Sequence, residues 1–239
     1  ERDMSHQNVD LHDHHSHENK STHSKTSLAV MYFCFVLSFD SMVTFMTIYF
    51  YWTYVSDGKE GAYGIAFSMY FLGTMIASPI LGLLAQKRNW WEAAVISLIL
   101  CIGGNAMYFS SIFFSPGNAV GISLFIVGRF IEGMGAAGIT LSLVYLISTS
   151  TTAERLGSMN RFRSWQFWGK FIGPCLGTIF LYIPIFSISD TPVFNPATYA
   201  PLSTIVFALA GLPMVILFCR EIKMKAVVDK IPIWKDKEA

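Results

Sequence analysis

The apolar residues of this 239-residue chain are gathered in long runs that short polar segments separate. A bilayer has a hydrocarbon core about 30 Å thick, so a helix that crosses it needs roughly 20 apolar residues. Six runs meet this length, namely residues 28–54, 62–85, 91–114, 120–147, 164–186 and 201–219. The pattern therefore predicts an all-α membrane protein with six transmembrane helices.

The composition agrees with this pattern, because 53% of the residues are hydrophobic and only 14% are charged, against about 25% charged in soluble domains. We expect a disordered, histidine-rich tail over residues 1–26, a helical bundle over 27–220, and a basic tail or the start of a central loop over 221–239. Fourteen Lys and Arg residues lie in the tails and the even-numbered connections, whereas Lys59 alone lies in the odd-numbered ones. Because basic residues gather on the cytoplasmic side, both termini are predicted there.

The run SLFIVGRFIEGMGAAG, residues 123–138, carries Arg129 and Glu132 in the middle of the fourth span. A charged side chain at such depth costs roughly 2.5–3.5 kcal/mol on insertion scales, so it marks a functional region more often than a structural one. Asp40 lies roughly 18 Å from the inner end of the first span, and Arg129 lies roughly 14 Å from the outer end of a span that runs the opposite way. In a core about 30 Å thick the two reach nearly the same depth.

Small residues mark the helix contacts that we expect. Gly169, Gly173 and Gly177 recur every four residues and form one flat ridge on the fifth span, which Pro174 kinks. The third span has no charge deep inside it and is predicted to pack only. The four cysteines are too scattered for a metal motif and are expected to pack as small hydrophobic residues.

Three segments make the chain resemble the N-terminal half of a major facilitator superfamily transporter. GLLAQKR, after the second span, resembles the G-x-L-A-D-R/K-x-G-R/K loop of that family through Gly82 and Lys87, with Arg88 beside them, although Gln86 and Asn89 depart from it. GRFIEGMGAAG resembles the R-x-x-x-G-x-G motif through Arg129, Gly133 and Gly135. GKFIGPCLG resembles the antiporter motif G-x-x-x-G-P-x-x-G through four residues, Gly169, Gly173, Pro174 and Gly177.

The resemblance implies secondary active transport of a small molecule or ion by alternating access, with a site between two six-helix halves near mid-bilayer. Asp40, Arg129 and Glu132 would form the substrate or proton pathway, and in the family the arginine is associated with proton coupling. Lys170 either faces this pathway or reaches back to the membrane surface. The other half would come from further chain or from a second copy. Within the family, the segments SMYFLGTMIASPILGL and TTAERLGSMN look most like the lysosomal, ceroid-lipofuscinosis-type branch, which suggests an endolysosomal membrane.

Other functions remain as alternatives. Arg129 and Glu132, three residues apart, would also pair on one helix for structural reasons alone. A Zn-type cation transporter would suit six helices and a histidine-rich segment, but all six histidines lie between His6 and His23, outside every span. A channel or scaffold subunit is the remaining option. No sequence pattern indicates an enzyme, a cofactor, a bound structural metal or a nucleic-acid partner.

Overall fold

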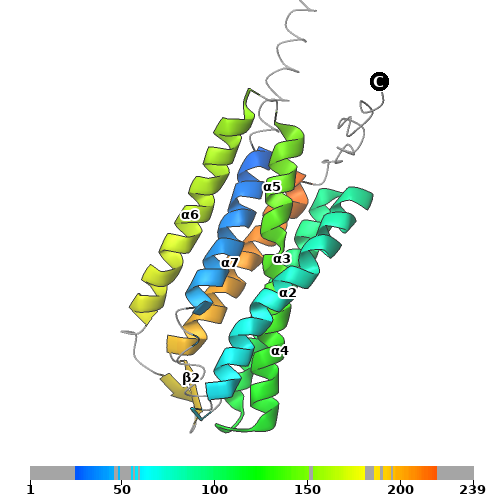
Figure 1. Ribbon diagram of the computed structural model, residues 1–239. Coiled ribbons are helices and arrows are strands. Elements are labelled where there is room, and N and C mark those ends of the chain that lie inside the picture. The colour runs from blue at the N-terminus through cyan, green and yellow to red at the C-terminus, as the bar shows by residue number, and fades with distance from the viewer. Residues whose placement is uncertain are drawn as a thin grey trace, which may run out of the picture.

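The computed structural model describes residues 25–45, 48, 55, 57–58, 60–150, 153–180, 186–188, 191–194 and 196–219. Within these residues the helices form six spans, which run alongside one another (Figure 1). They are an N-terminal helix (Lys25–Phe45), α2 (Glu60–Lys87), α3 (Trp90–Ser110), α4 (Ala119–Ala136) continued by α5 (Gly138–Thr149), α6 (Arg155–Phe180) and α7 (Pro196–Cys219). The predicted tails lie outside the described residues, apart from Lys25 and Thr26.

Five of the six spans are long and apolar enough to cross a membrane, with α4 and α5 counted together as Ala119–Thr149. The exception is α6, which begins at Arg155 rather than near residue 164 and so includes Arg161 and Arg163. The described part of α6 ends at Phe180, and Phe186, which we had placed in this span, lies in a strand instead. The predicted six-helix architecture is confirmed, with the fifth span shifted towards the N-terminus.

A short hairpin joins α6 to α7 at one end of the bundle. Strand β1 (Phe186–Ile188) pairs antiparallel with β2 (Thr191–Phe194), with Phe186 opposite Phe194. At the other end the first and last spans meet, because the Thr26 hydroxyl donates a hydrogen bond to the Phe218 carbonyl at 2.7 Å. An even number of crossings explains why these two helix ends lie on the same side. A 3₁₀ turn (Ser111–Phe113) follows α3.

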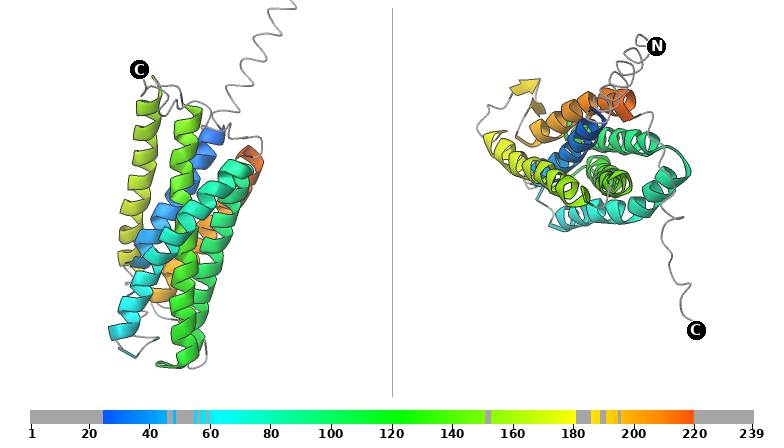
Figure 2. Two further views of the ribbon diagram at one scale, coloured as in Figure 1. Left: turned by 45° about the vertical axis from the view of Figure 1, so that its right-hand side comes forward. Right: turned by 90° about the horizontal axis from the view of Figure 1, so that it is seen from above.

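The N-terminal helix and α4 form the centre of the bundle, and α4 with α5 is surrounded by the other helices when seen from above (Figure 2, right). Phe33 of the N-terminal helix is fully buried and meets the Trp90 ring edge-on at 5.7 Å. On its other side this helix packs against α6, where a Cβ on Gly169 would lie 2.7 Å from the Phe35 carbonyl oxygen. In a membrane the hydrophobic effect does not drive helices together, and small residues let the helices approach closely enough to pack.

The fourth span is interrupted at Ala137, where α4 ends and α5 begins. The Ala137 carbonyl accepts from the Thr140 N–H at 3.2 Å, three residues on, which is the spacing of a 3₁₀ turn. The Ser97 hydroxyl of α3 donates to the Gly135 carbonyl at 2.6 Å. A side chain from a neighbouring helix that bonds to the backbone in this way is a recognised cause of a helix break.

Candidate functional site

Close helix packing sets the position of the charged residues on α4. A Cβ on Gly133 would overlap the Tyr70 carbonyl oxygen of α2, and one on Gly128 would lie 2.9 Å from the Gly104 carbonyl oxygen of α3. The glycines therefore hold α4 directly against two neighbours, and the two charged side chains between them are buried. Arg129 is 2% exposed and Glu132 is fully buried.

Arg129 and Glu132 form an ion pair within α4. One guanidinium nitrogen, Nη1, lies 2.7 Å from both Glu132 carboxylate oxygens. The guanidinium carbon lies 4.7 Å from the Tyr70 ring centre and 5.9 Å from that of Tyr108, so two aromatic rings add cation–π attraction. Within the described residues the buried Arg129 Nε–H has no hydrogen-bond partner. The cation is thus held by one carboxylate and two rings, and its Nε–H donor is unused.

Asp40 of the N-terminal helix completes the cluster and is also fully buried. Its Oδ1 accepts a hydrogen bond from Asn105 Nδ2 at 3.0 Å, and its Oδ2 accepts one from Cys101 Sγ at 3.4 Å. Its carboxyl group lies close to that of Glu132 and to the Arg129 charge. The structure thus brings Asp40 and Arg129, for which the sequence predicted nearly the same depth in the membrane, together with Glu132. We call Asp40, Arg129 and Glu132 the buried charge cluster.

The buried charge cluster contains two carboxyl groups and one guanidinium. If both acids are ionised, the cluster carries a net charge of −1 in a region that excludes water. An uncompensated buried charge is costly, and two adjacent carboxylates disfavour each other's ionised form. One bound proton makes the cluster neutral, and either Asp40 or Glu132 can hold that proton. The arrangement is suited to taking up and releasing a single proton.

The other predicted site and motif residues lie apart from this cluster. Lys170 is exposed on α6 and makes no salt bridge to any described residue. Lys87 ends α2 and is exposed, and Arg88 forms a salt bridge of 3.4 Å with Glu92. A Cβ on Gly82 would meet nothing within 4 Å, so no close contact explains that glycine. The roles assigned to these residues stay predictions.

The three further motif residues on α6 are placed as follows. A Cβ on Gly173 would lie 3.0 Å from the Val43 nitrogen, so this glycine packs on the N-terminal helix. Gly177 is buried, and Pro174 lies inside the helix between the two.

Sequence reasoning missed the contribution of α3. We had given this span a packing role and treated Cys101 as a small hydrophobic residue, yet Asn105 and Cys101 both donate to Asp40. Asn105 was the available signal, because a polar amide within an apolar span needs a partner. Tyr70 and Tyr108, which flank Arg129, gave no such signal, since aromatic residues are frequent in all the spans.

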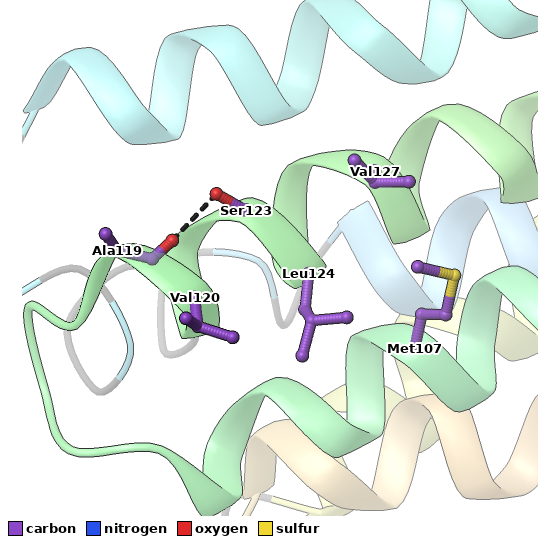
Figure 3. Close-up of a pocket in the computed structure, with 6 residues that line it drawn as sticks. All are labelled: Met107, Ala119, Val120, Ser123, Leu124 and Val127. Carbon is purple, nitrogen blue, oxygen red and sulfur yellow. Dashed lines mark hydrogen bonds between the residues drawn. The ribbon is translucent and has the colours of Figure 1, made fainter.

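A groove of about 340 Å³ lies between α3 and the first half of α4 (Figure 3). It is lined by Met107, Ala119, Val120, Ser123, Leu124 and Val127. Its one hydroxyl, on Ser123, donates back to the Ala119 carbonyl at 2.7 Å. A solute site needs a few free polar groups to orient its ligand, so this groove does not have the chemistry of one.

The apolar helices of the fold define a multi-pass integral membrane protein, and comparison with known proteins identifies the family. The sequence model of the Major Facilitator Superfamily matches residues 28–236. The chain is 23% identical over 193 residues to major facilitator superfamily domain-containing protein 8 of Xenopus laevis, covering 80% of this chain and 37% of that protein. The chain belongs to the Major Facilitator Superfamily, whose members are transporters rather than enzymes.

Solved structures show the same fold. The inward-open xylose transporter XylE from E. coli matches with a TM-score of 0.67 at 14% identity, over 80% of this chain and 47% of that one. Its partially occluded inward-open form matches with a TM-score of 0.69 at 13% identity, over 81% and 49%. The chain therefore spans about half the length of these transporters and little more than a third of the curated relative.

Proposed function

We propose that this chain is the N-terminal half of a secondary active transporter that moves a small solute by alternating access, coupled to protons. The observation that carries the proposal is the buried charge cluster. Two acids close to a single arginine form a site that becomes neutral on binding one proton. A helix bundle that only needed stability would gain nothing from it, because buried ion pairs are often no more stabilising than apolar side chains.

The burial of the cluster separates proton binding from solute binding. Arg129 is 2% exposed, and Asp40 and Glu132 are fully buried within this six-helix half. A solute held between two halves would not touch these side chains in the conformation seen here. In our proposal the cluster therefore binds the coupling proton, and the solute binds elsewhere, on a surface of this half that faces the second one.

Lys170 is a candidate for that surface. It is exposed on α6, and a lysine in a membrane span is unfavourable unless it faces water or a counter-charge. We propose that it lines the solute pathway, where an ammonium group would favour an anionic or hydrogen-bond-accepting solute. The flanking exposed side chains Phe167, Trp168 and Phe171 give this face of α6 the apolar character expected beside lipid or a second helical half.

The second half is part of the proposal. Coverage of 47–49% of the XylE structures supports a protein about twice this long, and two copies of the chain are the alternative. An immunoblot of the native protein separates these cases. A mass near twice 26.8 kDa indicates further chain, whereas a mass near 26.8 kDa indicates a half that must associate with a second copy.

We also propose an endolysosomal membrane, because the segments SMYFLGTMIASPILGL and TTAERLGSMN resemble a lysosomal branch and an acidic lumen would supply a proton gradient. Co-staining of the tagged full-length protein with a lysosomal marker tests this location. A distribution confined to the plasma membrane would contradict it.

Transport itself is tested with the full-length protein reconstituted into liposomes under an imposed pH gradient. A panel of labelled sugars, amino acids and organic anions is offered to the wild type, to Arg129→Ala and to the control Glu92→Gln. We expect at least one solute to accumulate in wild-type and Glu92→Gln liposomes but not in Arg129→Ala liposomes. Equal uptake by wild-type, Arg129→Ala and protein-free liposomes would overturn the proposed function.

A further inference from the structure

The carboxylate of Asp40 is held by α3 rather than by the arginine. Asn105 Nδ2 donates to Asp40 Oδ1 at 3.0 Å and Cys101 Sγ donates to Oδ2 at 3.4 Å. Asp40, Cys101 and Asn105 are each 0% exposed. Cys101 and Asn105 are four residues apart, so one turn of α3 presents both donors to one carboxylate. Each oxygen of Asp40 thus has its own donor.

The orientation of the Asn105 amide is fixed by chemistry. Its Nδ2 also donates to the Cys101 carbonyl at 3.0 Å, so both of its N–H groups are used. A flipped amide would point its oxygen at a carboxylate and a carbonyl, which are both acceptors. The amide therefore stays in place as a donor, and its position is tied to its own helix rather than to Asp40 alone.

Arg129, the cation of the cluster, is occupied by the other acid. Its Nη1 lies 2.7 Å from both oxygens of Glu132, and it makes no salt bridge with Asp40 among the described residues. The neutral donors of α3 therefore take the place of a cation for Asp40. Hydrogen bonds to the ionised form of an acid favour that form.

We propose that Asn105 and Cys101 are positioning residues that keep Asp40 ionised while Arg129 is paired with Glu132. This inference rests on the proposed proton-coupling role of the cluster and names the residues that set the proton affinity of Asp40. Because the two α3 donors stabilise the carboxylate, Asp40 takes up its proton at a lower pH than it would without them.

Other groups near Asp40 are accounted for in this scheme. The charged and titratable side chains that face it are Arg129 and Glu132 of α4, Tyr70 of α2 and Cys101 of α3. Thr204 of α7 lies beside the carboxylate and has no charge to contribute. Of these groups only Cys101 and Asn105 hydrogen-bond to Asp40 as donors from α3, so changing them alters Asp40 without removing a charge.

The test follows proton uptake by infrared spectroscopy and needs no known solute. Full-length protein in lipid is titrated with acid, and the carbonyl stretching band of protonated carboxylic acids is recorded. The component that Asp40→Asn removes reports on Asp40. We expect Asn105→Leu, which is of similar shape but cannot donate, to raise the midpoint of this component by about one to two pH units, a tenfold to hundredfold gain in proton affinity.

The cysteine provides a matched series. Cys101→Ala should raise the same midpoint by less than Asn105→Leu does, because a thiol is a weak donor, and Cys101→Ser should restore it, because a hydroxyl donates. Cys34 is equally buried on the N-terminal helix and has no hydrogen bond to Asp40, so Cys34→Ala should leave the midpoint unchanged. Thermal unfolding of each variant separates proton affinity from loss of the fold.

An unchanged Asp40 midpoint in folded Asn105→Leu or Cys101→Ala protein would overturn the inference, as would equal shifts in Cys101→Ala and Cys34→Ala. If Asn105→Leu does not fold, the midpoints of Cys101→Ser and Cys101→Ala alone test the inference. The result is independent of transport. Shifted midpoints without any transport would refute the proposed function and leave the positioning role, whereas transport with unshifted midpoints would do the reverse.

Discussion

Two neighbouring glycines on α3 allow a direct test of how closely α3 and α4 pack behind Glu132. A Cβ on Gly104 would lie 2.7 Å from the Glu132 Cα and 2.7 Å from the Gly128 carbonyl oxygen, whereas a Cβ on Gly103 would meet nothing within 4 Å. Carbon atoms in good contact lie about 3.5–4.0 Å apart. The atoms opposite Gly104 belong to the backbone of α4, so no side-chain rotation relieves the overlap.

The expected magnitude is the difference between Gly104→Ala and Gly103→Ala. Both variants gain roughly 0.8–1.0 kcal/mol of helix propensity, and this gain cancels in the comparison. Overpacking a tight interface costs about 1–3 kcal/mol, and only Gly104→Ala incurs it. A kcal/mol shifts the melting temperature by about 1–2 °C in a protein of the proposed full length, so Gly104→Ala should melt roughly 1–6 °C below Gly103→Ala.

The assay is thermal unfolding of the purified full-length protein in detergent, followed by tryptophan fluorescence. Gly103 and Gly104 lie on the same helix at nearly the same depth, and both are replaced by alanine. Effects of the detergent on the melting temperature are therefore the same for both variants. Indistinguishable melting temperatures for Gly103→Ala and Gly104→Ala would refute the close approach of α3 and α4 and, with it, the exclusion of water from the charge cluster.

Three further outcomes follow from the contacts. Glu132→Ala, which leaves a buried arginine without its carboxylate, should cost about 3–5 kcal/mol of stability, against about 0–1 kcal/mol for Glu92→Ala in an exposed pair; equal losses in thermal unfolding would contradict the burial. Ser97→Ala removes a buried hydroxyl that donates to a carbonyl of α4 and should cost about 1 kcal/mol, whereas Ser110→Ala, on an exposed part of α3, should cost far less by the same measurement. A cysteine at Lys87 should react with a membrane-impermeant maleimide from the cytoplasmic side only, and labelling from outside would reverse the predicted orientation.

The positions of the spans could be predicted because bilayer thickness fixes the length of a helix that crosses it. The start of α6 was missed since Arg155, Arg161 and Arg163 interrupt the apolar pattern without interrupting the helix. The break at Ala137 could not be predicted either. The Ser97 hydroxyl of another helix bonds to the α4 backbone beside this break, and sequence spacing along one helix does not report contacts with a second.

The candidate site could likewise be predicted only in part. Depth along each helix axis put Asp40 and Arg129 at one level, and the structure places them in one cluster. Rotation about each axis, which decides contact partners, comes from packing of all six spans. Arg129 therefore pairs with Glu132, and Asp40 with Asn105, in a way that the depth argument could not distinguish. Lys170, which the sequence grouped with them, lies exposed on α6.

The central claim is that the buried charge cluster couples a proton to solute movement, and the most direct measurement is the stimulation of uptake by a pH gradient. The initial rate of uptake into liposomes is measured with and without the gradient, for the wild-type protein and for Asp40→Asn, which cannot exchange a proton at this position. The account predicts that the gradient accelerates wild-type uptake and has no effect on Asp40→Asn. Full stimulation of Asp40→Asn by the gradient would contradict it.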